Sequence, residues 1–251
     1  MRNRRNSLLA CAALAFALPC FAQEKLPSAE SIIETYIEKI GGRAALEKLK
    51  SQINKGEMEV PGRDMKGAVT VYRAAPNKTR TVTEIAGIGK LEEGTDGETA
   101  WGLSAVQGAR LKEGEEKTQA LRAAEFNAEL NWRKTYPKAE VAGVEDVDGK
   151  PCYKIVLTPE TGTAVTRYYD KASGLMVRTS MTVKTPMGEI PMDSYVSDFR
   201  PEGGLLLPHK VTQKVMGREI VLTITSIQNN AEIDPAIFEI PAEVKALMKA
   251  K

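Results

Sequence analysis

Histidine and cysteine are scarce in this sequence. Its 251 residues include one histidine, His209, and three cysteines, of which Cys11 and Cys20 lie close to the N-terminus. A cysteine nucleophile needs a base beside it, and a His/Cys metal site needs several ligands, so both kinds of site are disfavoured. We expect no metal and no cofactor. The third cysteine, Cys152, opens the apolar run Cys152–Leu157, which favours a half-buried strand thiol.

Familiar catalytic motifs are also missing. The sequence has no Gly-x-Ser-x-Gly elbow, no phosphate-binding loop and no His-Glu-x-x-His pair. The carboxylate pairs Glu92-Glu93 and Glu115-Glu116 fall in turn or helix-start contexts, which favours solvated charge. His209 lies at a strand entry, which favours a structural or solvent-facing role. We therefore expect a protein that is not an enzyme.

No hydrophobic run is long enough to span a bilayer. The longest, Leu8–Leu18, has 11 residues, whereas a spanning helix needs roughly 20. Arginines precede it, and the small residues Cys20 and Ala22 occupy the first and third of the three positions before a natural cleavage point. These features predict a signal peptide over residues 1–22, cleaved after Ala22, and export to the periplasm.

Lipidation is the alternative for the same region. Leu8–Cys11 has the local pattern of a lipoprotein cleavage box, but too few residues precede it to form a hydrophobic core. Ala17–Cys20 is a second candidate, with Pro19 where a small residue should be. Acylation of either cysteine would leave the protein anchored by lipid in the envelope.

A strong charge of one sign is absent. Without residues 1–22 the chain has 32 basic and 33 acidic residues. Such a balance gives no electrostatic reason to bind nucleic acid, and we expect no nucleic-acid partner.

What the chain does have is one amphipathic helix followed by a long series of strands. Pro27 and Ser28 mark a helix start and Gly41-Gly42 a stop, with isoleucines recurring on one face between them. A shorter helical piece follows, containing Ala45, Leu46 and Leu49. From Gln52 onward the apolar period is two and turn residues recur, which predicts an antiparallel meander.

One face of this sheet is predicted to be dry. Apolar residues alternate with polar ones along the later strands, for example Leu175, Val177, Met181 and Val183 between Arg178, Ser180 and Thr182. Methionines in or beside these strands, Met58, Met176, Met181, Met192 and Met216, suit a flexible apolar wall and equally suit an ordinary filled core.

The meander is interrupted once, between Lys112 and Asn131. Apolar residues that include Leu121, Phe126 and Leu130 follow an acidic start, which predicts a moderately amphipathic helix that can cover the open face of the sheet. Since we find no internal repeat or linker, residues 23–251 are expected to form one domain. The predicted class is α+β, mainly antiparallel β.

Three local motifs in this order resemble the periplasmic lipoprotein-carrier superfamily of LolA and LolB. Val71–Asn77 resembles a strand that ends in arginine before Pro-Asn, and Thr95–Trp101 resembles the Ser-Asp-Gly-Lys-Thr-x-Trp hairpin. Ile233–Pro241 resembles the closing Val-Asp-x-x-x-Phe-x-x-x-Pro. The three motifs extend over nearly the whole chain after residue 22.

The resemblance implies a curled, half-open β barrel of sequential strands, with an N-terminal helix and an inserted lid helix over a hydrophobic cavity. It maps the arginine that holds the lid closed onto Arg73, although Ala74-Ala75 before Pro76 departs from the pattern and an ordinary strand-end charge is the alternative. Trp101 is expected to be either a core anchor or a cavity wall. Further cavity or lid candidates are Met181, Leu121 and Phe126.

The function implied is that of a non-catalytic periplasmic carrier. It would bind lipid or lipoprotein acyl chains as a monomer and deliver them toward the outer membrane, with inner- and outer-membrane transport proteins as further candidate partners. The alternative is a sensor or binding module of the RseB-like type that contacts an envelope protein. A structural subunit with a solid core is a third possibility.

Overall fold

One large antiparallel sheet dominates the structure. The computed structural model describes residues 25–186 and 188–249, so the predicted signal peptide lies outside the described part. Within it, thirteen strands pair in the order β6-β5-β4-β3-β2-β1-β13-β12-β11-β10-β9-β8-β7, and every neighbouring pair is antiparallel. The strands are β1 Ser51–Glu59, β2 Lys66–Ala74, β3 Lys78–Ile85, β4 Gly89–Thr95, β5 Ala100–Ser104, β6 Gly108–Leu111, β7 Lys138–Val147, β8 Lys150–Thr158, β9 Val165–Asp170, β10 Met176–Thr185, β11 Gly188–Glu202, β12 Leu205–Val215 and β13 Arg218–Asn229.

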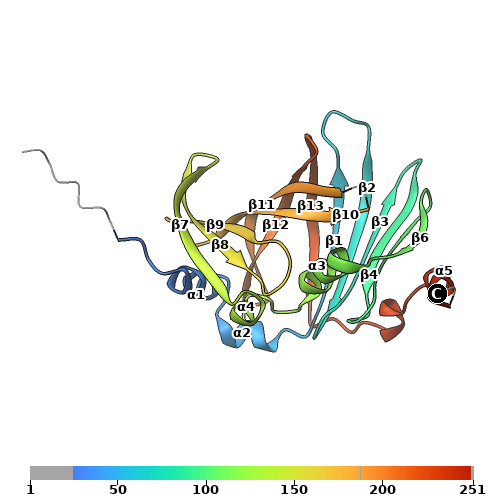
Figure 1. Cartoon of the computed structure of the whole chain (residues 1–251), viewed down its shortest axis with the longest axis horizontal. Coiled ribbons are helices and arrows are strands. Elements are labelled where there is room, and N and C mark those ends of the chain that lie inside the picture. Colours follow the sequence, from blue (N-terminus) through green and yellow to red (C-terminus); the bar gives the residue numbers. More distant parts are fainter. Residues whose placement is uncertain (1–24, 187, 250–251) are drawn as a thin grey trace, which may run out of the picture.

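The sheet is a curled, unclosed half barrel (Figure 1). Its two edges, β6 and β7, are consecutive strands in the chain, and residues 112–137 join them across the open side. This insert carries α3 and α4. The predicted meander, the inserted helix and the half-open barrel are therefore confirmed.

The helices are short and lie around the sheet. They are α1 Ala29–Lys39, α2 Arg43–Lys48, α3 Gly114–Ala124, α4 Trp132–Thr135, the 3₁₀ helix η1 Pro235–Phe238 and α5 Ala242–Lys249. No helix in the described ranges is long and apolar enough to cross a membrane.

The N-terminal helix begins and ends where its sequence predicts. The Ser28 side chain accepts a hydrogen bond from the amide of Ser31 at 3.1 Å, and Gly42, at φ +79°, donates its amide to the carbonyl of Ile37 at 2.9 Å. The apolar face of α1 packs into the main core, where the Ile37 side chain is 0% exposed. This core lies between α1, α2, the α3–α4 insert and the strands β8, β9 and β12.

The C-terminal segment covers the opposite, outer face of the sheet. Arg73 and Thr79 are directly opposite each other in the β2–β3 ladder, so Arg80 points to the other face. Arg80 donates a hydrogen bond to the carbonyl of Ile237 in η1 at 3.0 Å and lies 5.6 Å from the ring centre of Trp101. Trp101 is 1% exposed and is thus a core residue beneath the C-terminal segment.

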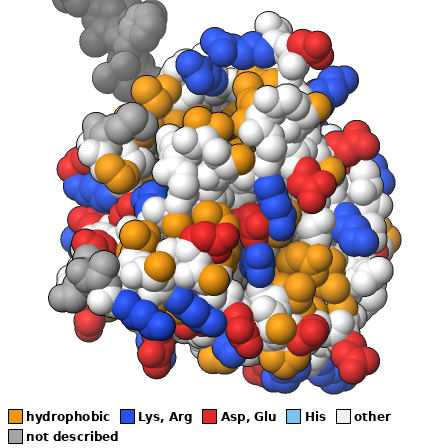
Figure 2. All heavy atoms as spheres, turned by 90° about the vertical axis from the view of Figure 1, so that its right-hand side faces the viewer, with side chains coloured by type: hydrophobic (Ala, Val, Ile, Leu, Met, Phe, Trp, Pro, Cys, Tyr) orange, Lys and Arg blue, Asp and Glu red, His pale blue; other side chains and the backbone are white. Residues whose placement is uncertain are grey.

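The surface on the β6 and α5 side has acidic and basic side chains interspersed with hydrophobic ones (Figure 2). On α5, Leu247 and Met248 are the exposed large hydrophobic residues of that helix. No single sign of charge dominates this face, in keeping with the balanced composition.

Three details differ from the sequence prediction. The inserted helix ends at Ala124, so Phe126 lies in the turn that follows it. Val177 falls at an irregularity in the β9–β10 register and packs with Cys152 and Tyr168 in a second small cluster, because the irregularity breaks the alternation of faces. Glu92 is 6% exposed and is not a solvated charge.

Candidate functional site

Helix α3 spans the open side of the half barrel and is held mainly by polar contacts. Its Glu116 side chain pairs with Arg110 of β6 at 2.7 Å. At the other side, Gln119 donates to the carbonyl of Thr182 in β10 at 3.0 Å and accepts from the amide of Lys184 at 3.0 Å. Ala124 is the one fully buried residue of the helix. The helix thus acts as a strap tied at both edges rather than as a deeply packed core element.

Arg73 ties the end of this strap to β2. Its Nη2 donates to the carbonyl of Glu125 at 3.1 Å, and its guanidinium lies 5.5 Å from the ring centre of Phe126. The amide of Phe126 in turn donates to the carbonyl of Pro76 at 2.8 Å. The turn after α3 is therefore fastened to the β2–β3 turn by side-chain and main-chain contacts.

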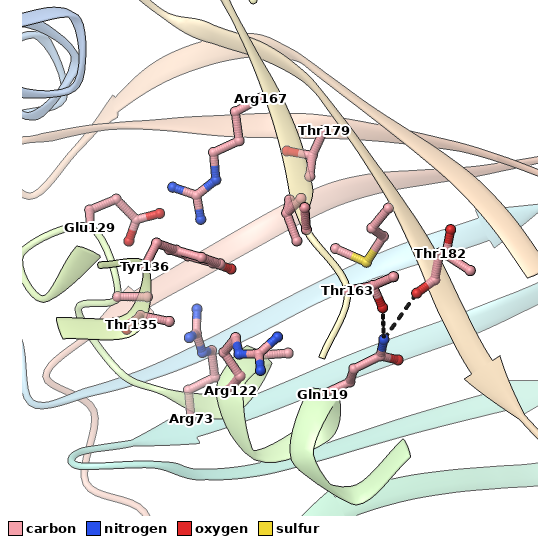
Figure 3. Close-up of a pocket in the computed structure, with 15 residues that line it drawn as sticks. Arg73, Gln119, Arg122, Glu129, Thr135, Tyr136, Thr163, Arg167, Thr179 and Thr182 are labelled. Carbon is pink, nitrogen blue, oxygen red and sulfur yellow. Dashed lines mark hydrogen bonds between the residues drawn. The ribbon is translucent and has the colours of Figure 1, made fainter. Parts of the chain in front are cut away.

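A cavity of about 250 Å³ lies between the strap and the strands β9 and β10 (Figure 3). Apolar groups from Val165, Met181 and Tyr136 form part of its wall. Figure 3 shows the guanidinium of Arg167 directed toward Glu129 above the ring of Tyr136. The cavity therefore combines an apolar wall with a charged end.

A second cavity, of about 270 Å³, lies between the segment that follows α3, the helices α1 and α2, and the strands β1, β12 and β13. Its wall is mostly apolar and includes Met176, Leu205 and Ile224. Arg73 and Glu129 line both cavities. The charged pair therefore lies at the boundary between two apolar hollows.

Burial and nearby groups shift the pKa values of Arg73 and Arg167 in opposite directions. Burial lowers the pKa of Arg73, and the nearby Glu129 carboxylate only partly offsets this effect. Burial would also lower the pKa of Arg167, but Tyr169 and Glu129 outweigh it and leave that pKa above the ordinary value. Both guanidiniums remain charged, as arginines do in proteins.

The predicted site residues divide into three groups. Arg73 lines both cavities, Met181 lines the first, and Phe126 lines the second with 5% of its surface exposed. Leu121 lines a more open hollow of about 600 Å³ beside α2 and the β2–β3 turn. Trp101 lies on the opposite face of the sheet, away from these cavities.

Arg167 and Glu129 are the residues that the sequence reasoning missed. Strand alternation places Arg167 on the same face as Val165 and Tyr169. A charged residue on a face that is otherwise apolar was the signal that could have identified it. Glu129 had no such signal, because it lies in the irregular segment between α3 and α4.

The two residues considered for chemistry are buried elsewhere. Cys152 is 0% exposed, and burial raises the pKa of its thiol to about 11. The His209 side chain is 3% exposed and lies between the Leu207 carbonyl at 3.1 Å and the Glu202 carboxylate at 3.0 Å. Both side chains are enclosed by the protein, which favours structural roles for them.

No protein-family model and no curated protein matches this sequence. Solved structures do match it. A DUF1329 family protein from Desulfovibrio piger has a TM-score of 0.57 at 13% identity, covering 84% of this chain and 97% of that one. A LolA superfamily protein from Nitrosomonas europaea has a TM-score of 0.56 at 14% identity, covering 86% and 99%.

The chain has a LolA-like fold. A Vibrio parahaemolyticus domain described as an outer membrane lipoprotein-sorting protein agrees, with a TM-score of 0.54 at 13% identity over 88% of this chain and 99% of that one. At such identities the likeness concerns the LolA-like fold, since one fold hosts many functions.

Proposed function

We propose that this LolA-like protein is a non-catalytic periplasmic carrier that binds lipid or lipoprotein acyl chains beneath the α3–α4 insert. The observation that carries the proposal is the pair of apolar-walled cavities on the concave side, which meet at Arg73 and Glu129. Each methylene moved from water into such a wall contributes roughly 0.8 kcal/mol, so a chain can be held by apolar contact alone.

The way the strap is held supports loading and release. Opening the side at β9 and β10 breaks six hydrogen bonds of α3 and exposes little apolar surface of that helix. Each bond is worth about 1 kcal/mol net, or about 1.5–3 kcal/mol where the Glu115 carboxylate or the Arg122 guanidinium takes part. Arg73 would keep the strap closed through the Glu125 carbonyl and the Phe126 ring until cargo enters. The resemblance implies this lid role for Arg73, and the contacts are in keeping with it.

The surroundings of the nucleophile candidates support a non-catalytic role. The Cys152 thiol is enclosed and its pKa is raised, which disfavours the reactive thiolate. His209 is confined by its two partners beneath the sheet surface. Neither residue lines the cavities under the strap.

Probe uptake tests the proposal directly. The processed protein should bind the uncharged fluorophore N-phenyl-naphthylamine, and Met181→Trp should weaken binding at least about tenfold by filling the first cavity. Met58→Trp is the matched control, because Met58 is a partly buried strand methionine that does not line either cavity. Its affinity should stay unchanged.

A second measurement identifies natural cargo. Native mass spectrometry of protein purified from its own envelope should show acyl-bearing adducts that organic extraction removes. Absence of both adducts and probe uptake would contradict the carrier proposal. Stoichiometric recovery of one inner-membrane protein together with empty cavities would favour the sensor module instead.

A further inference from the structure

Arg167 lies at the charged end of the first cavity. It is opposite Thr179 in the β9–β10 ladder, and both residues line this cavity. Arg167 is half-buried, and its guanidinium is directed into the hollow (Figure 3). The side chain therefore presents a planar, permanently charged fork to whatever occupies the space.

No carboxylate of the described chain pairs with this guanidinium. Within the described ranges Arg167 forms no ion pair, and its neutral neighbours are Tyr169 and Tyr136, whose ring centre lies 5.8 Å from the guanidinium. Glu129 acts on it electrostatically but is not within ion-pairing distance. An arginine fork in such a place retains the capacity to bind a carboxylate or phosphate in bidentate fashion.

The cluster as a whole has an excess of positive charge. Glu129 is the one acidic residue lining either cavity in the described chain, whereas Arg73 and Arg167 are both charged and Arg122 lines the first cavity as well. Arg73 donates a hydrogen bond to the carbonyl of Glu125, and Arg122 donates one to the carbonyl of Thr161. The three arginines are half-buried, and a charge that is partly removed from water without a counter-charge is costly, so an incoming anion would relieve this imbalance.

We propose that Arg167 and Arg73 bind the anionic head group, a carboxylate or a phosphate, of a lipid whose chain lies against the adjoining apolar wall. This inference rests on the proposed carrier function and specifies the class of its cargo. Arg73, Arg167 and Arg122 with Glu129 carry a net charge of +2, which leaves room for one carboxylate or one phosphate. The chain extends past Met181 and Val165 or into the second cavity, which shares Arg73 and Glu129.

Competition against bound N-phenyl-naphthylamine at pH 7 tests the head-group preference. Dodecanoate, dodecyl phosphate and dodecanol present the same chain with different heads. Wild-type protein should bind the two anions at least about tenfold more tightly than the alcohol, as expected for hydrogen bonds to a charged group. Arg167→Met should lose that preference while keeping its affinity for dodecanol.

Controls separate this inference from the carrier proposal. Arg200→Met removes a surface arginine paired with Asp198 and should retain the full preference. Arg167→Lys, which keeps the charge, should retain part of it. Acetate and inorganic phosphate test the head group alone and should compete only weakly.

Three results would overturn one or both of the proposals. Equal affinity of wild-type protein for dodecanoate and dodecanol overturns the head-group inference and leaves the carrier proposal standing. Displacement by inorganic phosphate as effective as by dodecyl phosphate overturns it as well, because the site would then bind a free anion. Failure of every chain to compete overturns both proposals.

Discussion

Glu92 offers the sharpest test of how the C-terminal segment is attached. Its carboxylate is 6% exposed on the outer face of β4, pairs with Arg80 and lies 2.6 Å from the Nζ of Lys90. Arg80 continues the network to the Ile237 carbonyl at 3.0 Å. Glu92→Gln should therefore leave the half-buried guanidinium of Arg80 without its counter-charge and loosen the contact with η1.

The expected loss of folding stability follows from the burial of the Glu92–Arg80 pair. Removing one partner of a buried ion pair costs about 3–5 kcal/mol. Because Arg80 is 20% exposed and keeps its hydrogen bond to Ile237, we expect the lower end, about 3 kcal/mol. For a protein of this size that corresponds to a fall in Tm of about 6–12 °C.

Glu93→Gln is the matched control for this experiment. Glu93 is adjacent, carries the same functional group and pairs with Lys112 at 3.1 Å, but its side chain is 61% exposed. Such a pair contributes at most about 1 kcal/mol. Both variants are to be compared by thermal and urea unfolding, and equal losses for Glu92→Gln and Glu93→Gln would refute the reasoning.

Lowering the pH should remove the difference in folding stability between wild-type protein and Glu92→Gln. Burial would raise the pKa of Glu92, but the hydrogen bonds from Lys90 and Arg80 outweigh it, so the folded-state pKa is below the ordinary value. A carboxyl with a lowered folded pKa stabilises the fold above its unfolded pKa, near 4.3, and this contribution is lost as the pH falls through the folded pKa. The difference between wild type and variant should thus be full at pH 7 and shrink below about pH 4.

Three further predictions concern the core and the strands. Ile37→Ala should cost about 2–5 kcal/mol in urea unfolding, because the side chain is 0% exposed in the main core; a loss below about 1 kcal/mol would show that α1 is not packed there. Gly94→Ala should cost about 1–3 kcal/mol, since its Cβ would lie 2.7 Å from the Trp101 ring, whereas Gly102→Ala should cost less because its nearest contact is a flexible side-chain atom at 3.4 Å. Cys152, with a thiol pKa of about 11, should resist alkylation in the native protein and react once urea unfolds it, as read by peptide mapping, and rapid native labelling would contradict its burial.

Local structure was predictable because its causes are local. The α1 helix is bounded by a Ser28 cap and a positive-φ Gly42, and both effects act over four or five residues. The hairpin turns follow in the same way, as in Thr95–Trp101, where the Asp96 side chain accepts hydrogen bonds from two following amides. The sheet-forming alternation likewise needs only neighbouring residues.

The sequence by itself thus determined the series of elements and the half-open antiparallel class. It also predicted Arg73, Met181 and Phe126 as cavity or lid residues, and their side chains line the hollows on the concave side. Only the tertiary structure decided that Trp101 and Glu92 are buried, since the segment that covers them comes from η1 and α5, more than a hundred residues later. It alone brought Arg167 and Glu129 together. Strand alternation states which side chains share a face, but what covers that face depends on contacts between distant parts of the chain.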